Sequence, residues 1–207
     1  MLQKAAICLL FTLFFIVQLM AQEKDFPVVN VPNSSDRDIP AGWVLAGSNP
    51  HDYAIGTDLL EKASGQSSAY LKSISVKPVG FVNLMQEIKA SNFKGQRIRL
   101  SASVKVKFVT GWAALWLRVE DIAGRPLGFD DMSNRPIIGT SDWVQYEVVL
   151  DVPNNSDKIC FGLLLSGKGQ VWIDNVKLLV VSNDIPVTDL LSKKTDPFYP
   201  QNMDFEE

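Results

Sequence analysis

The amino-acid sequence predicts an all-β protein, a two-sheet antiparallel β-sandwich of the jelly-roll kind. About ten short runs of alternating or β-forming residues lie between Trp43 and Val181, separated by Gly, Pro, Asn and Asp. Convincing 3.6-residue apolar spacing is missing, apart from a short helix that Thr57 to Ala63 could form. Strands without crossover helices cannot build a parallel sheet, so two antiparallel sheets packed face to face are expected.

Residues 1–21 have the layout of a secretory signal peptide. Lys4 precedes an apolar run from Ala5 to Met20, and the small residue Ala21 is placed for cleavage. A retained anchor is the alternative, but the run is at the short end for a membrane span. We therefore expect a mature chain with no membrane span, located in the periplasm or outside the cell, in which Cys160 is the only cysteine and is buried.

Residues 22–42 are predicted to be an extended lead-in and residues 43–181 the β-jelly-roll module. The clearest strand is Arg97 to Lys107, where apolar and polar residues alternate strictly, so that one face must be buried. Turn signals stand before it at Asn92 to Gly95, and Gly167-Lys168-Gly169 predicts a tight hairpin. The other predicted strands are Trp43–Ala46, Tyr53–Thr57, Ser67–Val76, Phe81–Lys89, Gly111–Glu120, Pro126–Asp130, Asp142–Val152, Lys158–Ser166 and Gln170–Val181.

Residues 182–207 are rich in Pro and charge and are predicted to be a flexible tail. Alternatively, Asn202 to Glu206 folds back as an edge strand of the sandwich.

Charge and motifs exclude several functions. The chain has 20 Lys and Arg against 23 Asp and Glu, which argues against nucleic-acid binding because neutralising phosphates takes a basic face. One His and two Cys exclude the usual zinc frameworks. The common nucleotide, dehydrogenase, hydrolase and metalloprotease motifs are also missing from the sequence.

The strand from Trp112 to Val119 carries the main candidate ligand-binding residues. If Ala113, Leu115, Leu117 and Val119 point into the core, the opposite face presents Trp112, Ala114, Trp116 and Arg118. Indole rings can stack on the C–H groups of a sugar and a guanidinium can reach its hydroxyls. The alternative is that a loop covers the indoles and that Arg118 only caps them by cation–π contact.

Two further segments are candidates for the same surface. The loop after Gly128 carries Asp130, Asp131 and Arg135, although turns favour these residue types in any case. On the next strand, Trp143 and Gln145 face outward and extend the surface if the strands are neighbours. Other side chains are assigned structural places: Gln86 as a buried hydrogen-bonded amide, Trp43 and Trp172 in the core, and His51 in an exposed loop.

The span from Trp43 to Val181 resembles a non-catalytic β-jelly-roll module of the galactose-binding or carbohydrate-binding kind, nearest to the version that accompanies some bacterial AraC-type regulators and exported enzymes. The resemblance rests on Gly42-Trp43, Ser67–Ser73, Leu84–Ala90, Gly111–Val119, Phe129–Met132, Arg135–Ile137 and Leu164–Trp172. It implies the fold but transfers no catalytic residue and no defined ligand.

One departure from that family's pattern concerns a metal. Such modules usually open with a strand reading Asn-x-x-Phe-Glu, whose acid helps to hold a structural cation, but Val29 to Asn33 contains neither Phe nor Glu. This departure leaves a structural Ca²⁺ near Asp174 in doubt, and no other cofactor is expected.

The favoured function is an exported, non-catalytic module that binds carbohydrate through the aromatic face. The alternative is a structural or protein-interaction subunit of the cell envelope that uses the same face as its interface, so the expected partner is a glycan or an envelope protein. An enzyme is a third reading, because Asp130, Asp131 and Glu147 are carboxylates that could flank a cleft.

Overall fold

Strand β5 (Gln96–Asp121) is the longest element and organises the fold. The sequence predicts two strands here, Arg97–Lys107 and Gly111–Glu120, but the backbone continues through the junction and bends at Phe108, whose φ is 55°. The register with the neighbouring strand shifts at several points around this bend, which marks β-bulges. One strand therefore serves both layers of the sandwich, and the structure has nine strands in the described residues instead of about ten.

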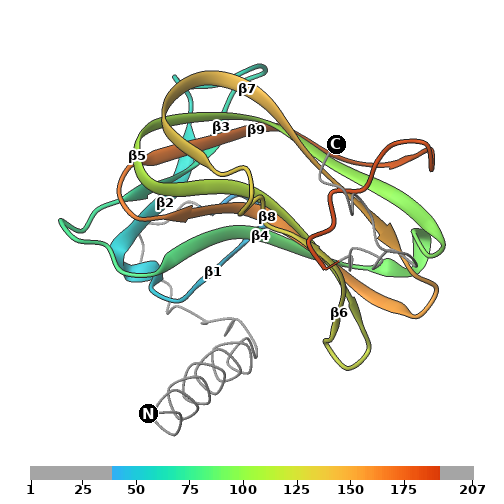
Figure 1. The fold of residues 1–207 in the computed structure, drawn as a ribbon. Helices are drawn as coiled ribbons and strands as arrows, with labels where there is room; N and C mark the ends of the chain where they lie inside the picture. The colour runs from blue at the N-terminus through green and yellow to red at the C-terminus, as the bar shows by residue number, and fades with distance from the viewer. Residues whose placement is uncertain (1–38, 192–207) are drawn as a thin grey trace, which may run out of the picture.

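The computed structural model describes residues 39–191 (Figure 1). Their elements confirm the all-β jelly-roll prediction, with antiparallel pairing between all neighbouring strands. Besides β5, the strands are β1 (Val44–Gly47), β2 (Tyr53–Asp58), β3 (Ser68–Ser73), β4 (Phe81–Lys89), β6 (Pro126–Asp130), β7 (Ile137–Val152), β8 (Ser156–Ser166) and β9 (Gln170–Val181), and two short 3₁₀ turns are η1 (Pro50–Asp52) and η2 (Ala90–Asn92).

The strands form two layers joined through β5. Its first half pairs with β9 and β7, and β9 continues to β3 and β2, which gives the first layer. Its second half pairs with β8 and β6, and β8 continues to β4 and β1, which gives the second layer. Figure 1 shows β3, β5, β7 and β9 arching above β1, β4 and β8.

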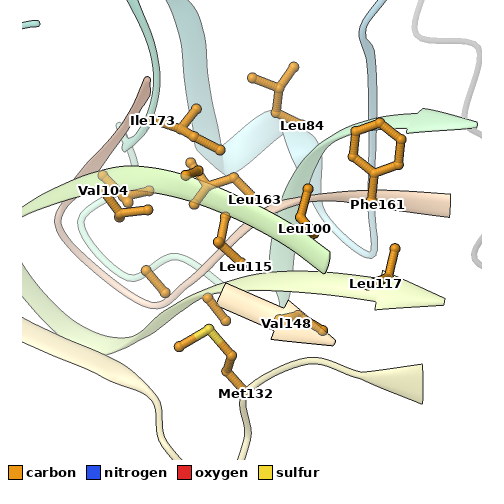
Figure 2. Packing of buried hydrophobic residues seen from close by; sticks show 14 of the residues in the cluster. Leu84, Leu100, Val104, Leu115, Leu117, Met132, Val148, Phe161, Leu163 and Ile173 are labelled. Carbon is orange, nitrogen blue, oxygen red and sulfur yellow. The ribbon is translucent and has the colours of Figure 1, made fainter. Parts of the chain in front are cut away.

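The core lies between the two layers, as the alternation of β5 predicts. Leu100 and Val104 from its first half meet Leu115 and Leu117 from its second half (Figure 2). Strands β4 and β8 add Leu84 and other apolar side chains that are completely buried. About 25 cal/mol per Å² of buried apolar area makes this interior the main source of stability. The same core cluster includes Met132, Val148, Phe161, Leu163 and Ile173, which Figure 2 also labels.

One local prediction is wrong, and another holds for burial but not for position. The segment from Thr57 to Ala63 contains no helix: β2 runs to Asp58, and the following residues form bends. Trp172 does not lie between the layers, because it pairs with the outward-facing Lys105. Its ring is nevertheless 4% exposed, since the loop after β2 covers it and its indole Nε1 donates to the Asp58 carboxylate at 2.9 Å.

The ends of the chain are described only in part. The predicted signal peptide, most of the lead-in and the string Asn202 to Glu206 lie outside the described residues. Two residues of the segment after β9 are hydrogen-bonded to the sandwich: Thr188 N donates to Val149 O at 2.8 Å and Leu190 N to Phe129 O at 2.8 Å. Between residues 39 and 191 we find no helix long and apolar enough to cross a bilayer.

Candidate functional site

The second half of β5 places the predicted aromatic residues on one face. Ala113, Leu115 and Leu117 belong to the core between the layers, so Trp112, Trp116 and Arg118 project from the outer face of the second layer. Trp116 packs there in a second apolar cluster whose other buried members are Ala46, Met85, Cys160 and Leu164. The predicted facing of these residues is therefore confirmed.

This aromatic face is closed at Trp116, whereas Trp112 is half-buried. Trp116 is only 4% exposed, and its indole Nε1 is buried without a hydrogen-bond partner. The Arg118 guanidinium Nη2 lies 2.5 Å from Glu120 Oε1, in an ion pair that is mostly shielded from solvent. A sugar ring needs an open indole face to stack upon, so Trp116 does not offer one in this conformation.

The predicted loop residues bind each other. Asp130 is fully buried, and its two oxygens accept hydrogen bonds from Arg135 Nη1 at 3.0 Å and Nη2 at 2.6 Å. Met132 N also donates to Asp130 Oδ1, while Asp131 accepts from Ser133 N in a local turn. A bidentate pair closed by a backbone donor fixes the loop and engages both oxygens of the fully buried Asp130 carboxylate.

Trp143 and Gln145 do not extend the aromatic face. Strand β7 does pair with β5, but at these residues it pairs with the first half, where Gln145 stands opposite Ser103. Both side chains therefore lie on the outer face of the first layer, on the other side of the sandwich from Trp112 and Trp116. The eight candidate residues consequently do not form one surface.

A groove that the sequence does not predict opens between the two layers. It has a volume of about 430 Å³, within the range of small-molecule sites. Its floor includes the buried side chains of Phe161 and Ile173, and it is lined further by Pro40, Trp43, Thr57, Ser67, Ser68, Ala69, Gln86, Asp174, Asn175, Val176 and Leu178.

One side of the groove carries an aromatic ring and an amide. Trp43 stands just before β1 and is half-buried, with its ring edge-on to Phe161 at 6.1 Å between centroids and 80° between planes. Gln86 lies on β4 in register with the inward Leu84, but at the position where the layers part, so its amide lines the groove. The prediction of Gln86 as a buried hydrogen-bonded amide is therefore wrong, because its side chain is half-buried and lines an open groove.

The opposite side is built around a break in β9. Asn175 adopts the left-handed conformation with φ of 54°, and the pairing with β5 shifts register there. Asp174 Oδ2 accepts from the backbone N–H groups of Ala63 and Ser64, both at 2.9 Å, and Ser64 Oγ lies 2.6 Å from Asn175 Oδ1. These bonds hold the loop after β2 against the rim of the groove.

The part of the chain from residue 39 to 191 contains no group of three His, Cys, Asp or Glu side chains able to hold a metal ion. The resemblance raises the question of a structural cation near Asp174. The carboxylate of Asp174 accepts hydrogen bonds from the backbone N–H groups of Ala63, Ser64 and Asn175.

The chain is similar in sequence to an uncharacterized HTH-type transcriptional regulator, YbfP, of Bacillus subtilis (strain 168). The two are 46% identical over 167 residues, which are 80% of this chain and 57% of the regulator. The chain thus spans little more than half of that relative's length. No family model matches the chain.

Solved structures share the fold at low identity. The enzymatically active domain of tailspike protein 4 from bacteriophage CBA120 matches with a TM-score of 0.52 and 17% identity, over 72% of this chain and 21% of that one. The CBM22-1–GH10 modules of Clostridium thermocellum xylanase 10B, complexed with xylohexaose, match with a TM-score of 0.50 and 13% identity, over 73% and 28%.

Proposed function

We propose that this chain is an exported, non-catalytic module that binds a carbohydrate in the groove between its two layers. The observation that carries the proposal is the pairing of a half-buried indole, Trp43, with the Gln86 amide in an open groove of about 430 Å³. Concave sites that join apolar walls to a few polar groups are where small ligands bind.

The lining suits a sugar ring. The edge-on contact with Phe161 restricts the orientation of the Trp43 indole, so a pyranose that stacks on this ring needs little reordering of the side chain. The Gln86 amide provides a donor and an acceptor, and the hydroxyls of Thr57 and Ser67 line the other wall. This combination recognises a ligand that has C–H faces and hydroxyl edges.

The carboxylates support a non-catalytic role. Glycoside hydrolysis needs two carboxyl groups on either side of the bond. Asp174 is the single acid among the described residues that line the groove, and it already accepts from three backbone N–H groups. Asp130, Asp131 and Glu147 are not among the lining residues.

The similarity to the regulator is compatible with ligand binding. A helix-turn-helix reads DNA with an α-helix in the major groove, and residues 39–191 contain no α-helix. We infer that residues 39–191 supply a function other than DNA contact, and the carbohydrate-binding fold neighbour favours a ligand-binding one.

Calorimetry with a panel of polysaccharides and oligosaccharides tests the proposal. Trp43→Ala should weaken binding at least about tenfold, because a stacking contact worth about 1.5 kcal/mol is lost. Gln86→Ala should weaken it about fivefold through a hydrogen bond worth about 1 kcal/mol. The matched controls are Trp143→Ala and Gln145→Ala, which remove the same side chains from the outer face of the first layer.

If Trp143→Ala or Gln145→Ala weakens saccharide binding as strongly as Trp43→Ala and Gln86→Ala do, the groove is not the binding site. An absence of binding to any saccharide, with a concentration-dependent molecular mass, would favour the envelope interaction subunit instead. Export is tested separately: the N-terminus of the protein recovered outside the cytoplasm should be Gln22.

A further inference from the structure

One end of the sandwich exposes apolar side chains from three separate segments. Phe108 at the bend of β5 is 70% exposed, Val76 in the loop after β3 is 80% exposed, and Ile74, Val79 and Ile138 are exposed as well. Figure 1 shows the β3–β4 loop, the bend of β5 and the β8–β9 turn together at the left end of the molecule. Isolated exposed apolar residues are ordinary, but a contiguous group marks a contact surface.

Three hydrogen bonds show that these segments are neighbours. Ser73 N donates to Gly169 O at 2.9 Å, which ties the loop after β3 to the β8–β9 turn. Thr110 N donates to Lys168 O at 3.0 Å, which ties that turn to the bend of β5. Phe108 N donates to Thr140 Oγ1 at 3.0 Å, which brings in the start of β7 beside Ile138. The end is therefore a braced surface, which we call the apolar tip.

The charge at this tip differs in sign from that of the whole chain. Lys72, Lys77, Lys107 and Lys168 are exposed on the same segments, and within the described part of the chain none of them forms an ion pair. Asp52 also faces the tip, but its carboxylate is engaged by Asn49 Nδ2 and Val79 N. The protein as a whole has a net charge of −3, so the tip is a local basic region on an acidic molecule.

The backbone holds the aromatic ring of Phe108 outward at a conformational cost. Its φ of 55° lies in the left-handed region, which bulky side chains rarely adopt. Lys107 Nζ lies 5.8 Å from the centroid of its ring. Packing within the chain does not explain why a strained residue should expose an aromatic ring beside a cation, so we look for the reason in a contact with another surface.

We propose that the apolar tip binds the surface of a membrane containing anionic lipids. Apolar side chains at loop tips enter the boundary between headgroups and acyl chains, while lysines around them attract the negative surface. The tip projects its side chains from several loops, and none of its apolar residues is among those that line the groove, which fits an extended surface better than a single small anion. This surface is separate from the groove, so it would hold a carbohydrate-binding module near a bilayer.

Co-sedimentation with vesicles tests the proposal, using the chain without residues 1–21 because the apolar run Ala5–Met20 would itself bind lipid. The protein should pellet with vesicles of equal phosphatidylglycerol and phosphatidylcholine, and much less with phosphatidylcholine alone. Phe108→Asn, which tolerates the left-handed backbone, should weaken binding at least about fivefold. Lys107→Glu combined with Lys168→Glu should weaken it more strongly, and 0.5 M NaCl should act in the same direction, since each lysine near the surface contributes about fivefold.

Two controls carry similar changes elsewhere. Ile122→Ser removes an apolar side chain that is 84% exposed in the β5–β6 turn, and Lys177→Glu reverses an exposed charge on β9; neither should change vesicle binding. Pelleting that is independent of anionic lipid, or equally sensitive to the controls, would overturn the proposal, as would a failure to pellet. Saccharide binding of the Phe108→Asn variant should stay unchanged, because Phe108 does not line the groove. Membrane binding and saccharide binding can therefore be tested, and can fail, independently.

Discussion

Cys160 shows how burial controls the chemistry of a single side chain. The thiol is 1% exposed in the cluster around Trp116, and burial raises its pKa to about 11, with a smaller contribution from the nearby Glu120. Only the thiolate is a strong nucleophile, and little of it exists at neutral pH when the pKa is so high. The residue is a packing group of the second layer.

A thiol-labelling experiment measures this inertness. With Ellman's reagent at pH 8, the chain without residues 1–21 should release almost no chromophore when native and one equivalent in guanidinium chloride. Rapid stoichiometric labelling of the native protein would show that the aromatic face opens readily.

Gly162 has a steric role in the centre of β8. A Cβ at this residue would collide with the Leu84 carbonyl oxygen and would lie 2.9 Å from Met85 Cα, both in the backbone of β4. Backbone atoms cannot move aside as a flexible side chain can, so we expect Gly162→Ala to lower the free energy of unfolding by about 1–3 kcal/mol.

Urea denaturation of two variants checks this. Gly128→Ala is the matched control, because its Cβ would meet Leu150 Cδ1 at an ordinary 3.6 Å. Equal midpoints for the two variants would mean that β4 and β8 can separate at little cost.

At the scale of elements, the loop after β2 clamps the outer face of the first layer. Asp58 accepts from Trp172 Nε1 and from the N–H groups of Leu60 and Glu61, and Lys105 Nζ lies 2.9 Å from Glu61 Oε2. Partial burial of Asp58 opposes its ionisation, but these hydrogen bonds prevail and hold the pKa of its carboxyl below the usual value. The folded state therefore favours the charged form.

The pH dependence follows from the sign of that shift. Asp58 contributes stability above the pKa of the unfolded chain, about 3.9, and loses it as the pH falls through the lower folded-state pKa. Asp58→Asn should be less stable than the parent at pH 7, and the difference should narrow toward pH 3. Thermal unfolding at both pH values measures it, and a difference that widens in acid would contradict the assignment.

The strands also show how far local sequence patterns can predict the fold. Alternation located every strand and the inward residues of β5, because period-two patterning is local. It divided β5 in two at Phe108 to Thr110, where the chain bends without ending, since a bulge has no distinctive residue and needs a partner strand to exist. The short helix expected after Thr57 did not form, because Asp58 bonds the backbone locally and to Trp172.

At the scale of the molecule, the site depends on contacts that no local pattern contains. The sequence placed Trp112 and Trp116 on one face correctly, but it joined Trp143 to them because it could not tell which half of β5 pairs with this part of β7. The groove was missed for the same reason. Its walls come from the segment before β1, from β4 and from β8 on one side and from β2, β3 and β9 on the other, which meet only through the fold.

Chemical-shift mapping tests the central claim most directly. A ¹⁵N-labelled chain without residues 1–21 is titrated with a saccharide that binds in calorimetry, and the indole and side-chain amide N–H signals are followed. The account predicts the largest shifts at the Trp43 indole and the Gln86 amide, with Trp112, Trp116 and Trp143 unchanged. Shifts confined to Trp112 and Trp116 would move the ligand to the outer face of the second layer and contradict the groove.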